Sequence, residues 1–162
     1  MSLSTIRDQI IFEIGGRTDL NSVIDDQINY AVEEIGCMYP FYELQQTATT
    51  TTVSGQLTYL LPTDLFILWT VRDETKLKRM LVYKDKQAID DIDRDILGQP
   101  YNWTRYRNGL VLFNNGPDNN GGSNYSIRIR YWKYLPELTT DTDASELPER
   151  LERGVRLKAT AF

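Results

Sequence analysis

Apolar residues at the start of the chain recur at spacings of three and four, which predicts two amphipathic helices. The first apolar stripe consists of Leu3, Ile6, Ile10 and Ile14, and the second consists of Leu20, Ile24, Ile28, Ala31, Ile35 and Met38. We expect Ser2 or Ser4 to cap the first helix and Gly15 with Gly16 to end it. Because the connection over residues 15–19 is short, the two helices should form a helical hairpin.

The middle of the chain carries apolar residues mostly at every second position, a pattern typical of β-strands. Strands are predicted over residues 47–53, 56–61, 65–72, 76–83, 103–107, 110–113 and 125–134. Two turn signals indicate hairpins: Ser54-Gly55 between the first two strands, and Asn108-Gly109 between the fifth and sixth. A short helix is expected over residues 85–98.

The order of these elements predicts an α+β fold with the helices segregated from the sheet. We expect a helical hairpin over residues 1–44, then a central antiparallel β-sheet or small sandwich with one inserted short helix over 45–138. An acidic linker and a C-terminal helix should follow over 139–162, and the whole chain, 41% hydrophobic, should form a single domain. The terminal helix begins at Pro148 and lacks a glycine or proline stop signal, so we expect it to have a neighbouring partner or a continuation.

The charge and cysteine content exclude several classes of protein. The formal net charge of -5 gives no general reason for nucleic-acid binding, which depends on cations that neutralise phosphates. Residues 1–60 contain two cations and eight carboxylates, so the acidic excess lies at the N-terminal end. Cys37 is the single cysteine and no secretory signal pattern is present, so we expect a reducing compartment. We expect no membrane span, because the longest apolar run, residues 65–71, is too short.

Candidate catalytic chemistry is sparse. The sequence contains no histidine, which removes histidine-activated nucleophiles, histidine general bases and histidine metal sites. Two groups of carboxylates resemble metal sites: Asp90, Asp91, Asp93 and Asp95, and a calcium-loop-like series of Asp141, Asp143, Ser145, Glu149 and Glu152. We interpret the first group as the solvated face of the short helix. The second group has Glu146 where a calcium loop requires glycine. We therefore expect no catalytic residue, no metal site, no cofactor and no enzymatic activity.

Aromatic and cationic residues alternate around Trp103 and Trp132. If these tryptophans are exposed, they can stack on carbohydrate or single-stranded nucleic acid, and the chain is then a small β-rich binding module. If they pack across adjacent strands, as large aromatic residues in sheets more commonly do, they belong to the core. Both interpretations remain open from the sequence.

The linear order of motifs is more informative than any of them alone. After the helical pair come an aromatic segment, threonine-rich strands, a Tyr-x-Leu-Pro-x-Asp element (Tyr59, Leu61-Pro62, Asp64), a tyrosine-rich strand, Leu135-Pro136-x-Leu138, the acidic linker and Leu147-Pro148. Over nearly the whole chain this order resembles the head-to-tail adaptor proteins of tailed bacteriophages, also called connector or head-completion proteins.

The resemblance implies a structural protein of the virion neck and tail that assembles in the host cytoplasm. Adaptors of this kind form a homo-oligomeric ring, commonly of twelve copies, that docks on the portal protein and continues into a tail or nozzle protein. DNA passes through the lumen of such a ring without specific binding, and neither catalysis nor a membrane is involved. The acidic balance of the chain fits this role, because a dense cationic lining would retain DNA.

The resemblance also implies which residues contact partners. Portal binding is expected along the terminal helix, at Arg150, Leu151, Arg153, Val155, Arg156, Lys158 and Phe162. Charge complementarity, independently of the resemblance, leads us to expect contacts between subunits that join carboxylates of the helical hairpin to cations of the terminal helix or of the strand at 125–134. The carboxylates are Asp25, Asp26, Glu33 and Glu34, and the strand cations are Arg128 and Arg130.

Overall fold

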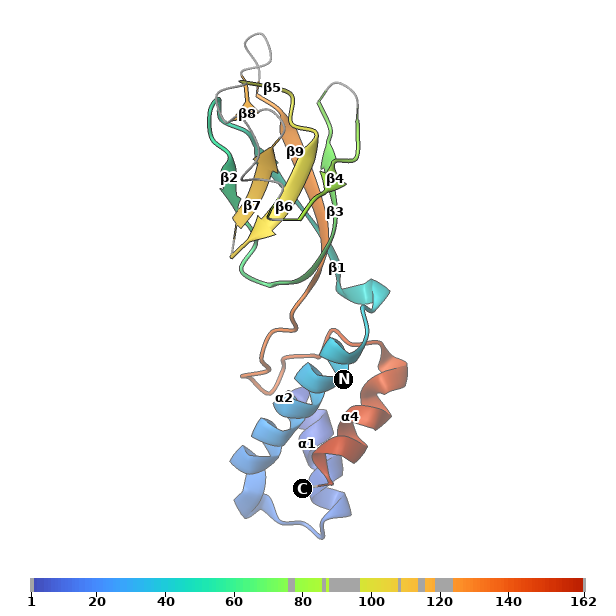
Figure 1. Ribbon diagram of the computed structural model, residues 1–162. Coiled ribbons are helices and arrows are strands. Elements are labelled where there is room, and N and C mark those ends of the chain that lie inside the picture. The colour runs from blue at the N-terminus through green and yellow to red at the C-terminus, as the bar shows by residue number, and fades with distance from the viewer. Residues whose placement is uncertain are drawn as a thin grey trace. The chain divides into compact units, whose positions relative to one another are not determined.

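The computed structural model describes residues 2–75, 78–85, 87, 97–107, 109–113, 116–118 and 124–161 (Figure 1). The chain folds into two compact units. The helical unit comprises Met1–Gln45 and Trp132–Phe162, and the β unit comprises Gln46–Tyr131. The β unit is therefore inserted in sequence between the two segments that build the helical unit. That the whole chain acts as one domain stays a prediction.

The helical unit contains the predicted helical hairpin and the predicted C-terminal helix. Its elements are α1 (Leu3–Glu13), η1 (Thr18–Leu20), α2 (Asn21–Met38), η2 (Tyr42–Leu44), η3 (Glu149–Leu151) and α4 (Glu152–Ala159), where η marks a 3-10 turn. The Ser2 hydroxyl accepts a hydrogen bond from the Thr5 N–H and is the N-cap of α1. Gly15 and Gly16 follow α1 with φ of +83° and +82°, a conformation that glycine adopts without strain.

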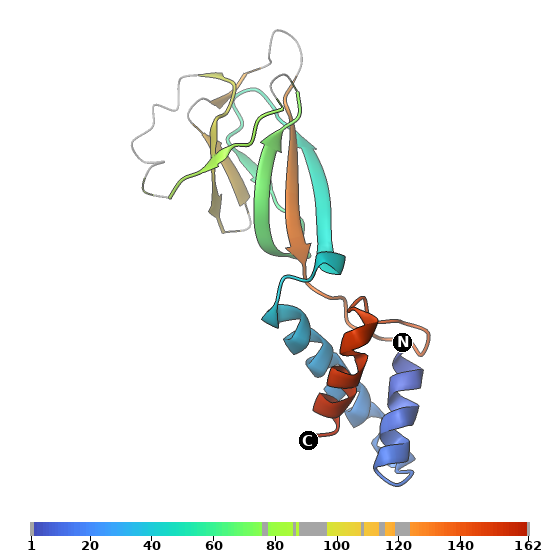
Figure 2. The ribbon, with the colours of Figure 1, turned by 90° about the vertical axis from the view of Figure 1, so that its right-hand side faces the viewer.

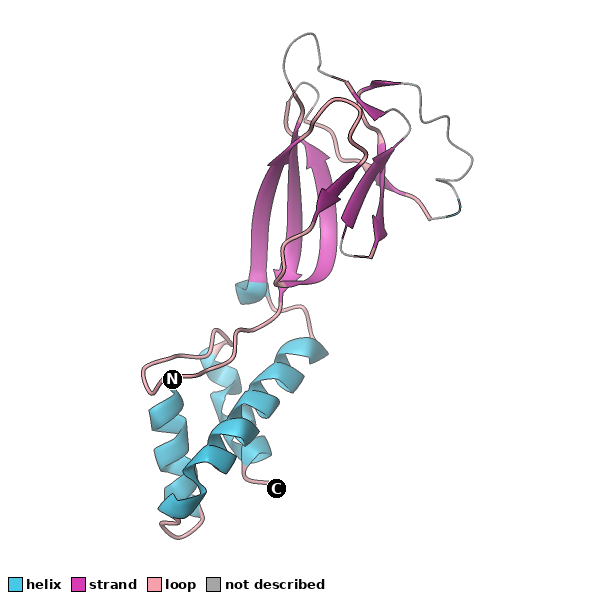
Figure 3. Ribbon diagram, turned by 90° about the vertical axis from the view of Figure 1, so that its left-hand side faces the viewer, coloured by secondary structure: helices cyan, strands magenta, loops and turns pink. Residues whose placement is uncertain are grey.

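The core of the helical unit joins both apolar stripes of the hairpin to residues from the far end of the chain. Its buried members are Leu3, Ile6, Ile10, Ile24, Ile28, Ala31, Val32, Leu44, Leu138, Leu147, Val155 and Ala159. Figures 2 and 3 show α4 lying alongside α1 and α2. α4 contributes Val155 and Ala159 to this core. The terminal helix is thus a wall of this core.

The segment between β9 and α4 is bound to the helical unit rather than free of it. The Asn29 side chain of α2 accepts a hydrogen bond from the Leu138 N–H at 2.8 Å and donates one to the Leu138 carbonyl at 3.0 Å. The Leu3 N–H donates to the Asp143 carbonyl at 2.8 Å. Lys133 Nζ lies 2.5 Å from Glu146 Oε2. The bonds to Asn29 and Leu3 hold this segment against the hairpin, and the ion pair of Glu146 ties it to Lys133 at the end of β9.

The β unit contains a three-stranded and a four-stranded sheet together with a small two-stranded one. The three-stranded sheet has the order β1 (Gln45–Thr51), β9 (Ser126–Lys133), β3 (Leu65–Asp73), and Figure 2 shows β9 running opposite to both neighbours. The four-stranded sheet has the order β2 (Thr58–Leu60), β7 (Gly109–Phe113), β6 (Asn102–Tyr106), β4 (Val82–Tyr83). The third pairs β5 (Leu97–Gly98) with β8 (Gly116–Pro117).

A common core joins the two larger sheets, as expected for a small sandwich. Alternate residues of β9 and of the position before it face inward, as predicted, and are 0–5% exposed: Tyr125, Ile127, Ile129 and Tyr131. They pack in one cluster with Trp103, Leu110 and Leu112 from the four-stranded sheet. The predicted α+β class is confirmed, although the pairs β4–β6 and β5–β8 are parallel rather than antiparallel.

One predicted hairpin is wrong. The strand at 56–61 was expected to pair with the strand at 47–53 across Ser54-Gly55. Instead β2 pairs with β7, and β1 lies beside β9, with the Thr52 N–H donating to the Tyr125 carbonyl at 2.8 Å. The seven-residue β1 obtains a long ladder only from a long partner, and β2 has three residues.

The second predicted hairpin is present with its turn displaced by one residue. Tyr106 pairs with Gly109, so the connection begins at Arg107, whose φ is +52°. Gly109 lies inside β7 rather than in the turn, and a Cβ there would come within 2.8 Å of Thr58 Cγ2. A larger residue at this position would require the Thr58 side chain of β2 to move, which favours glycine.

Two further predictions fall partly outside the described residues, the helix for most of its length and the strand only at positions 76 and 77. The short helix expected over 85–98 lies there except for positions 85, 87, 97 and 98, and the last two form β5. Of the strand expected over 76–83, Val82–Tyr83 forms β4 and Met80 makes an isolated bridge with Arg72. In the described part of the chain, none of the helices has the length and apolar character that a membrane span requires.

We predict that Ile28→Ala lowers the free energy of unfolding by about 2–5 kcal/mol, because Ile28 is fully buried between the helices and its loss leaves a cavity. Urea denaturation followed by circular dichroism measures this change. Val23→Ala on the same helix is the control, because Val23 is 53% exposed and should change stability by at most about 0.5 kcal/mol. Equal effects of the two substitutions would show that the helical core is not packed as described.

Candidate interaction surface

The inner face of the terminal helix packs against the core of the helical unit. Val155 is 2% exposed, and Leu151 packs against the same cluster from the preceding turn. Both residues were predicted as apolar anchors for a partner. Val155 therefore supports the helix from inside the core, whereas Leu151 is only partly buried and keeps some accessible surface.

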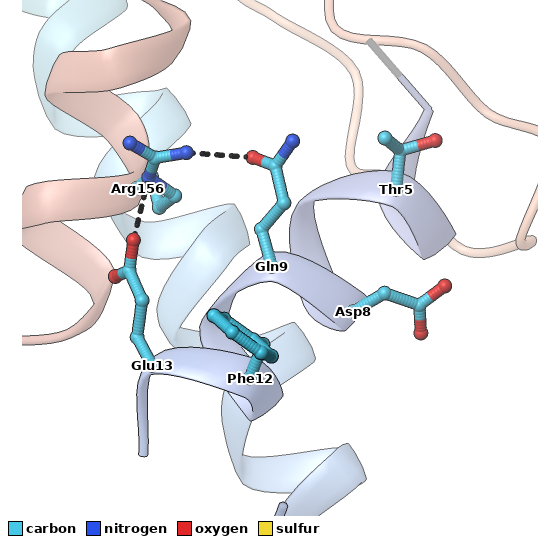
Figure 4. A pocket seen from close by; sticks show the side chains of 6 residues that line it. All are labelled: Thr5, Asp8, Gln9, Phe12, Glu13 and Arg156. Carbon is cyan, nitrogen blue, oxygen red and sulfur yellow. Dashed lines mark hydrogen bonds and ion pairs between the residues drawn. The ribbon is translucent and has the colours of Figure 1, made fainter. Parts of the chain in front are cut away.

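Two predicted cations of α4 bind carboxylates and an amide of the helical hairpin. Figure 4 shows Arg156 pointing toward α1, where its Nη1 donates to Gln9 Oε1 at 2.9 Å and its Nε lies 3.2 Å from Glu13 Oε1. Lys158 Nζ lies 2.8 Å from Glu34 Oε1 on α2. Because these pairs remain partly solvated, each contributes modestly to stability, but together they orient α4 on the hairpin.

The outer face of α4 and its preceding turn is accessible. Arg150 and Arg153 are exposed, and Leu157 is 54% exposed beside them. Phe162, also a predicted portal contact, lies outside the described residues. The residues predicted to bind the portal therefore lie on two sides of the helix. Arg150 and Arg153 lie on its exposed side, and Val155 lies on the side that packs against the core.

The residues predicted for subunit contacts separate in the same way. Arg7 binds Asp25 through two hydrogen bonds of 2.6 and 2.8 Å, and Arg128 Nη2 lies 2.7 Å from Glu74 Oε1. Of the predicted subunit-contact residues, Asp25, Glu34 and Arg128 are thus already paired inside the chain, Glu34 with Lys158. The accessible members of the set are Asp26, Glu33 and Arg130.

Arg7 connects three segments of the helical unit. Besides its bonds to Asp25, its Nη1 lies 2.8 Å from Asp141 Oδ1 in the linker. The hydrogen bonds that Arg7 donates to Asp25, and secondarily to Asp141, raise the pKa of Arg7 further above its usual range, against the opposing effect of burial. The sequence pattern did not identify Arg7, because its partners are 18 and 134 residues away along the chain.

Two shallow pockets on the helical unit carry carboxylates. The first is lined by Thr5, Asp8, Gln9, Phe12, Glu13 and Arg156 (Figure 4). In it the Arg156 guanidinium already engages Gln9 and Glu13, while the Asp8 side chain points away from Arg156. The second is lined by Asn29, Val32, Glu33, Leu135, Pro136 and Glu137. Glu137 was not predicted as a contact residue and lies in the Leu135-Pro136-x-Leu138 motif, before the predicted acidic linker. Below, the linker means the whole segment between β9 and η3, residues 134–148.

Within the calcium-loop-like series, Asp143 binds backbone N–H groups of the linker. Asp143 Oδ2 accepts hydrogen bonds from the N–H groups of Thr139 and Thr140, both at 2.8 Å, and Oδ1 accepts from Thr140 Oγ1 at 2.7 Å. These bonds lower the pKa of Asp143 to about 2, with the Thr140 hydroxyl as the largest cause. Among the residues that the structure describes, no group of carboxylates and cysteines could hold a metal ion. The series Asp90, Asp91, Asp93 and Asp95 lies outside them.

The two tryptophans do not form a binding platform. Trp103 is 7% exposed in the β unit, where its ring meets Tyr83 edge to face with centroids 5.0 Å apart. Trp132 belongs to the helical unit and packs against its core. Trp103 is therefore a core residue, and Trp132 is a partly buried residue at the edge of a different core. The two rings do not pack against each other across adjacent strands, and the burial of Trp103 removes it from any exposed stacking platform.

Two buried tyrosines of the β unit are held by carboxylates. The Tyr125 hydroxyl donates to Asp118 Oδ1 at 2.8 Å, and the Tyr131 hydroxyl donates to Asp64 Oδ1 at 3.1 Å. Burial, reinforced by these hydrogen bonds, raises the pKa of both phenols, that of Tyr131 to about 12. These groups fix the inner face of β9 and offer no acid or base for chemistry near neutral pH.

We predict that Asp143→Asn destabilises the protein near neutral pH and has progressively less effect in acid. The folded-state pKa of about 2 lies below the ordinary value of 3.8, so this contribution is present above about pH 4 and disappears as the pH falls through 2. Urea denaturation of both proteins at several pH values measures the difference. Glu137→Gln, which neutralises another exposed carboxylate of the linker, is the control and should remain close to wild type. A difference that does not vary with pH would contradict the prediction.

The chain matches the model of one protein family over residues 1–162, and that family is described as SU10 adaptor protein. No curated protein matches the chain.

Proposed function

Because the chain belongs to the SU10 adaptor protein family over its whole length, we propose that it is the structural joint between the portal and the tail of a bacteriophage. In this proposal the protein forms a homo-oligomeric ring of twelve copies in the virion neck, after assembly in the host cytoplasm. The ring docks on the portal protein, continues into a tail or nozzle protein, lets DNA pass through its lumen and performs no catalysis. The family match, which includes both units and the linker, is the observation that carries the proposal.

The charge of the two units supports a ring of identical copies. The helical unit contains seven Lys and Arg against fourteen Asp and Glu, whereas the β unit contains eleven against nine. A closed ring is built from a heterologous contact, in which two different surfaces of each subunit complement each other. A chain with one strongly acidic unit and one weakly basic unit carries such a pair of surfaces.

The accessible part of the terminal helix supports a contact with the portal. Arg150, Arg153 and Leu157 face outward, while the opposite side of the same helix is fixed by Val155 and Arg156. A rigid helix presents its side chains with little loss of conformational entropy on binding. We therefore narrow the portal contact to this outer face.

The proposal predicts that the purified protein has a mass many times the 18.8 kDa of one chain, or becomes a ring when the portal protein of the same phage is added. Native mass measurement and light scattering distinguish a ring from a monomer, and electron microscopy counts its subunits. A chain that remains monomeric and does not bind the portal under any of these conditions would falsify the proposed function.

Charge reversal at the outer face of the terminal helix tests the portal contact separately. We expect Arg150→Glu combined with Arg153→Glu to weaken portal binding at least about tenfold, because cations at an interface are replaced by repelling carboxylates. Binding to immobilised portal protein measures the change. Arg17→Glu is the control, since Arg17 is an exposed cation of the same unit and its ion pair is with its near neighbour Asp19. Unchanged binding by the double variant would place the portal contact elsewhere.

A further inference from the structure

The tip of the β6–β7 hairpin carries exposed cations. Arg105, Tyr106 and Arg107 are exposed there, and the positive φ of Arg107 brings its guanidinium over the Tyr106 ring, 5.4 Å from the centroid. Within the described parts of the chain, no carboxylate lies within ion-pair distance of Arg105 or Arg107. This differs from Arg128 in the same unit, which is paired with Glu74.

The second pocket of the helical unit has complementary chemistry. Glu33 of α2 and Glu137 of the linker supply two exposed carboxylates, and Val32, Leu135 and Pro136 supply apolar surface in a pocket of about 390 Å³. Neither carboxylate has a cationic partner among the described residues. An apolar surface beside two carboxylates suits an arginine, whose aliphatic stem can be buried while its guanidinium remains paired.

The other carboxylate pocket is a poorer match. Its Glu13 is already neutralised by Arg156, and Gln9 accepts a second hydrogen bond from the same guanidinium. An incoming cation would meet Arg156 as a like charge. Charge complementarity therefore selects the pocket at Glu33 and Glu137.

We propose that the hairpin tip Arg105–Arg107 of one copy binds the Glu33 and Glu137 pocket of a second copy, an inference that rests on the proposed ring. Every copy carries one tip and one pocket, so the contact is heterologous and can continue from subunit to subunit until the ring closes. Arginine and tyrosine are the residue types that most often dominate binding energy at interfaces. Nucleic acid is the less favoured ligand of the tip, because two cations on a chain of net charge -5 give little attraction to phosphates.

Charge exchange tests the contact. Arg105→Glu and Glu33→Arg are each expected to raise the protein concentration needed for half-maximal assembly about tenfold, because each places like charges opposite each other. The variant with both substitutions should return to within about threefold of wild type, because its tip and pocket are again complementary. Sedimentation velocity measures assembly of the chain alone or on the portal protein of the same phage. Lys84→Glu and Glu43→Arg, which reverse exposed charges elsewhere in the two units, are the matched controls.

A second measurement identifies the partners directly. A mixture of ¹⁴N- and ¹⁵N-labelled Arg105→Lys protein is treated with a carbodiimide, which joins a lysine to a carboxylate in contact with it. Peptides linking Lys at 105 to Glu33 or Glu137 with mixed isotopes support the contact between copies. Links confined to one isotope overturn the inference and indicate a contact within the chain.

The outcomes separate this inference from the proposed function. Rings that assemble normally with either single reversal overturn the contact and leave the adaptor function intact. A loss of DNA retention without any change in assembly also overturns the contact and assigns the tip to nucleic acid. If the wild-type chain forms no ring alone or on the portal, the proposed function fails, and the contact fails with it.

Discussion

Burial of the apolar stripes on α1 and α2 is the constraint on which the remaining structure depends. Two amphipathic helices cannot cover each other completely, and the uncovered part is closed by Leu138 and Leu147 of the linker and by Val155 and Ala159 of α4. The chain must therefore return to its first helices after more than eighty residues of β structure. The crossings between the units fall in β1 and β9, which are neighbours in one sheet.

The same packing decides which charges remain available to a partner. Arg156, Lys158 and Asp25 were attractive contact residues in the sequence, and each is bound inside the helical unit. Internal pairing leaves a smaller accessible set in which Arg150 and Arg153 lie on one surface and Glu33 lies on another. In the proposed function, these separate surfaces would allow the copies to bind one another and the portal simultaneously.

Much of the fold could be predicted because a repeat of apolar residues reports local geometry. The inward face of β9 and most of the two helical stripes were predicted correctly, since a side chain's face depends only on its own element. The last residue of each stripe is an exception, because Ile14 and Met38 are exposed at the helix ends. The partners of β1 and β2 were predicted wrongly, because the true partners, β9 and β7, lie far along the chain. The positive φ at Arg107 had no signal of its own, since the Asn-Gly pattern indicated a turn one residue later.

The sequence by itself determined the class of fold, the absence of histidine chemistry and the membership of the adaptor proteins, because composition, period and motif order are properties of the chain alone. Only the tertiary structure decided that Val155 and Trp103 are buried, that Asp143 caps the linker, and that Glu33 and Glu137 share a pocket. The physical reason is that an apolar or charged pattern shows that one face of a helix or strand needs a partner. Which distant segment packs against that face depends on the path of the chain in three dimensions.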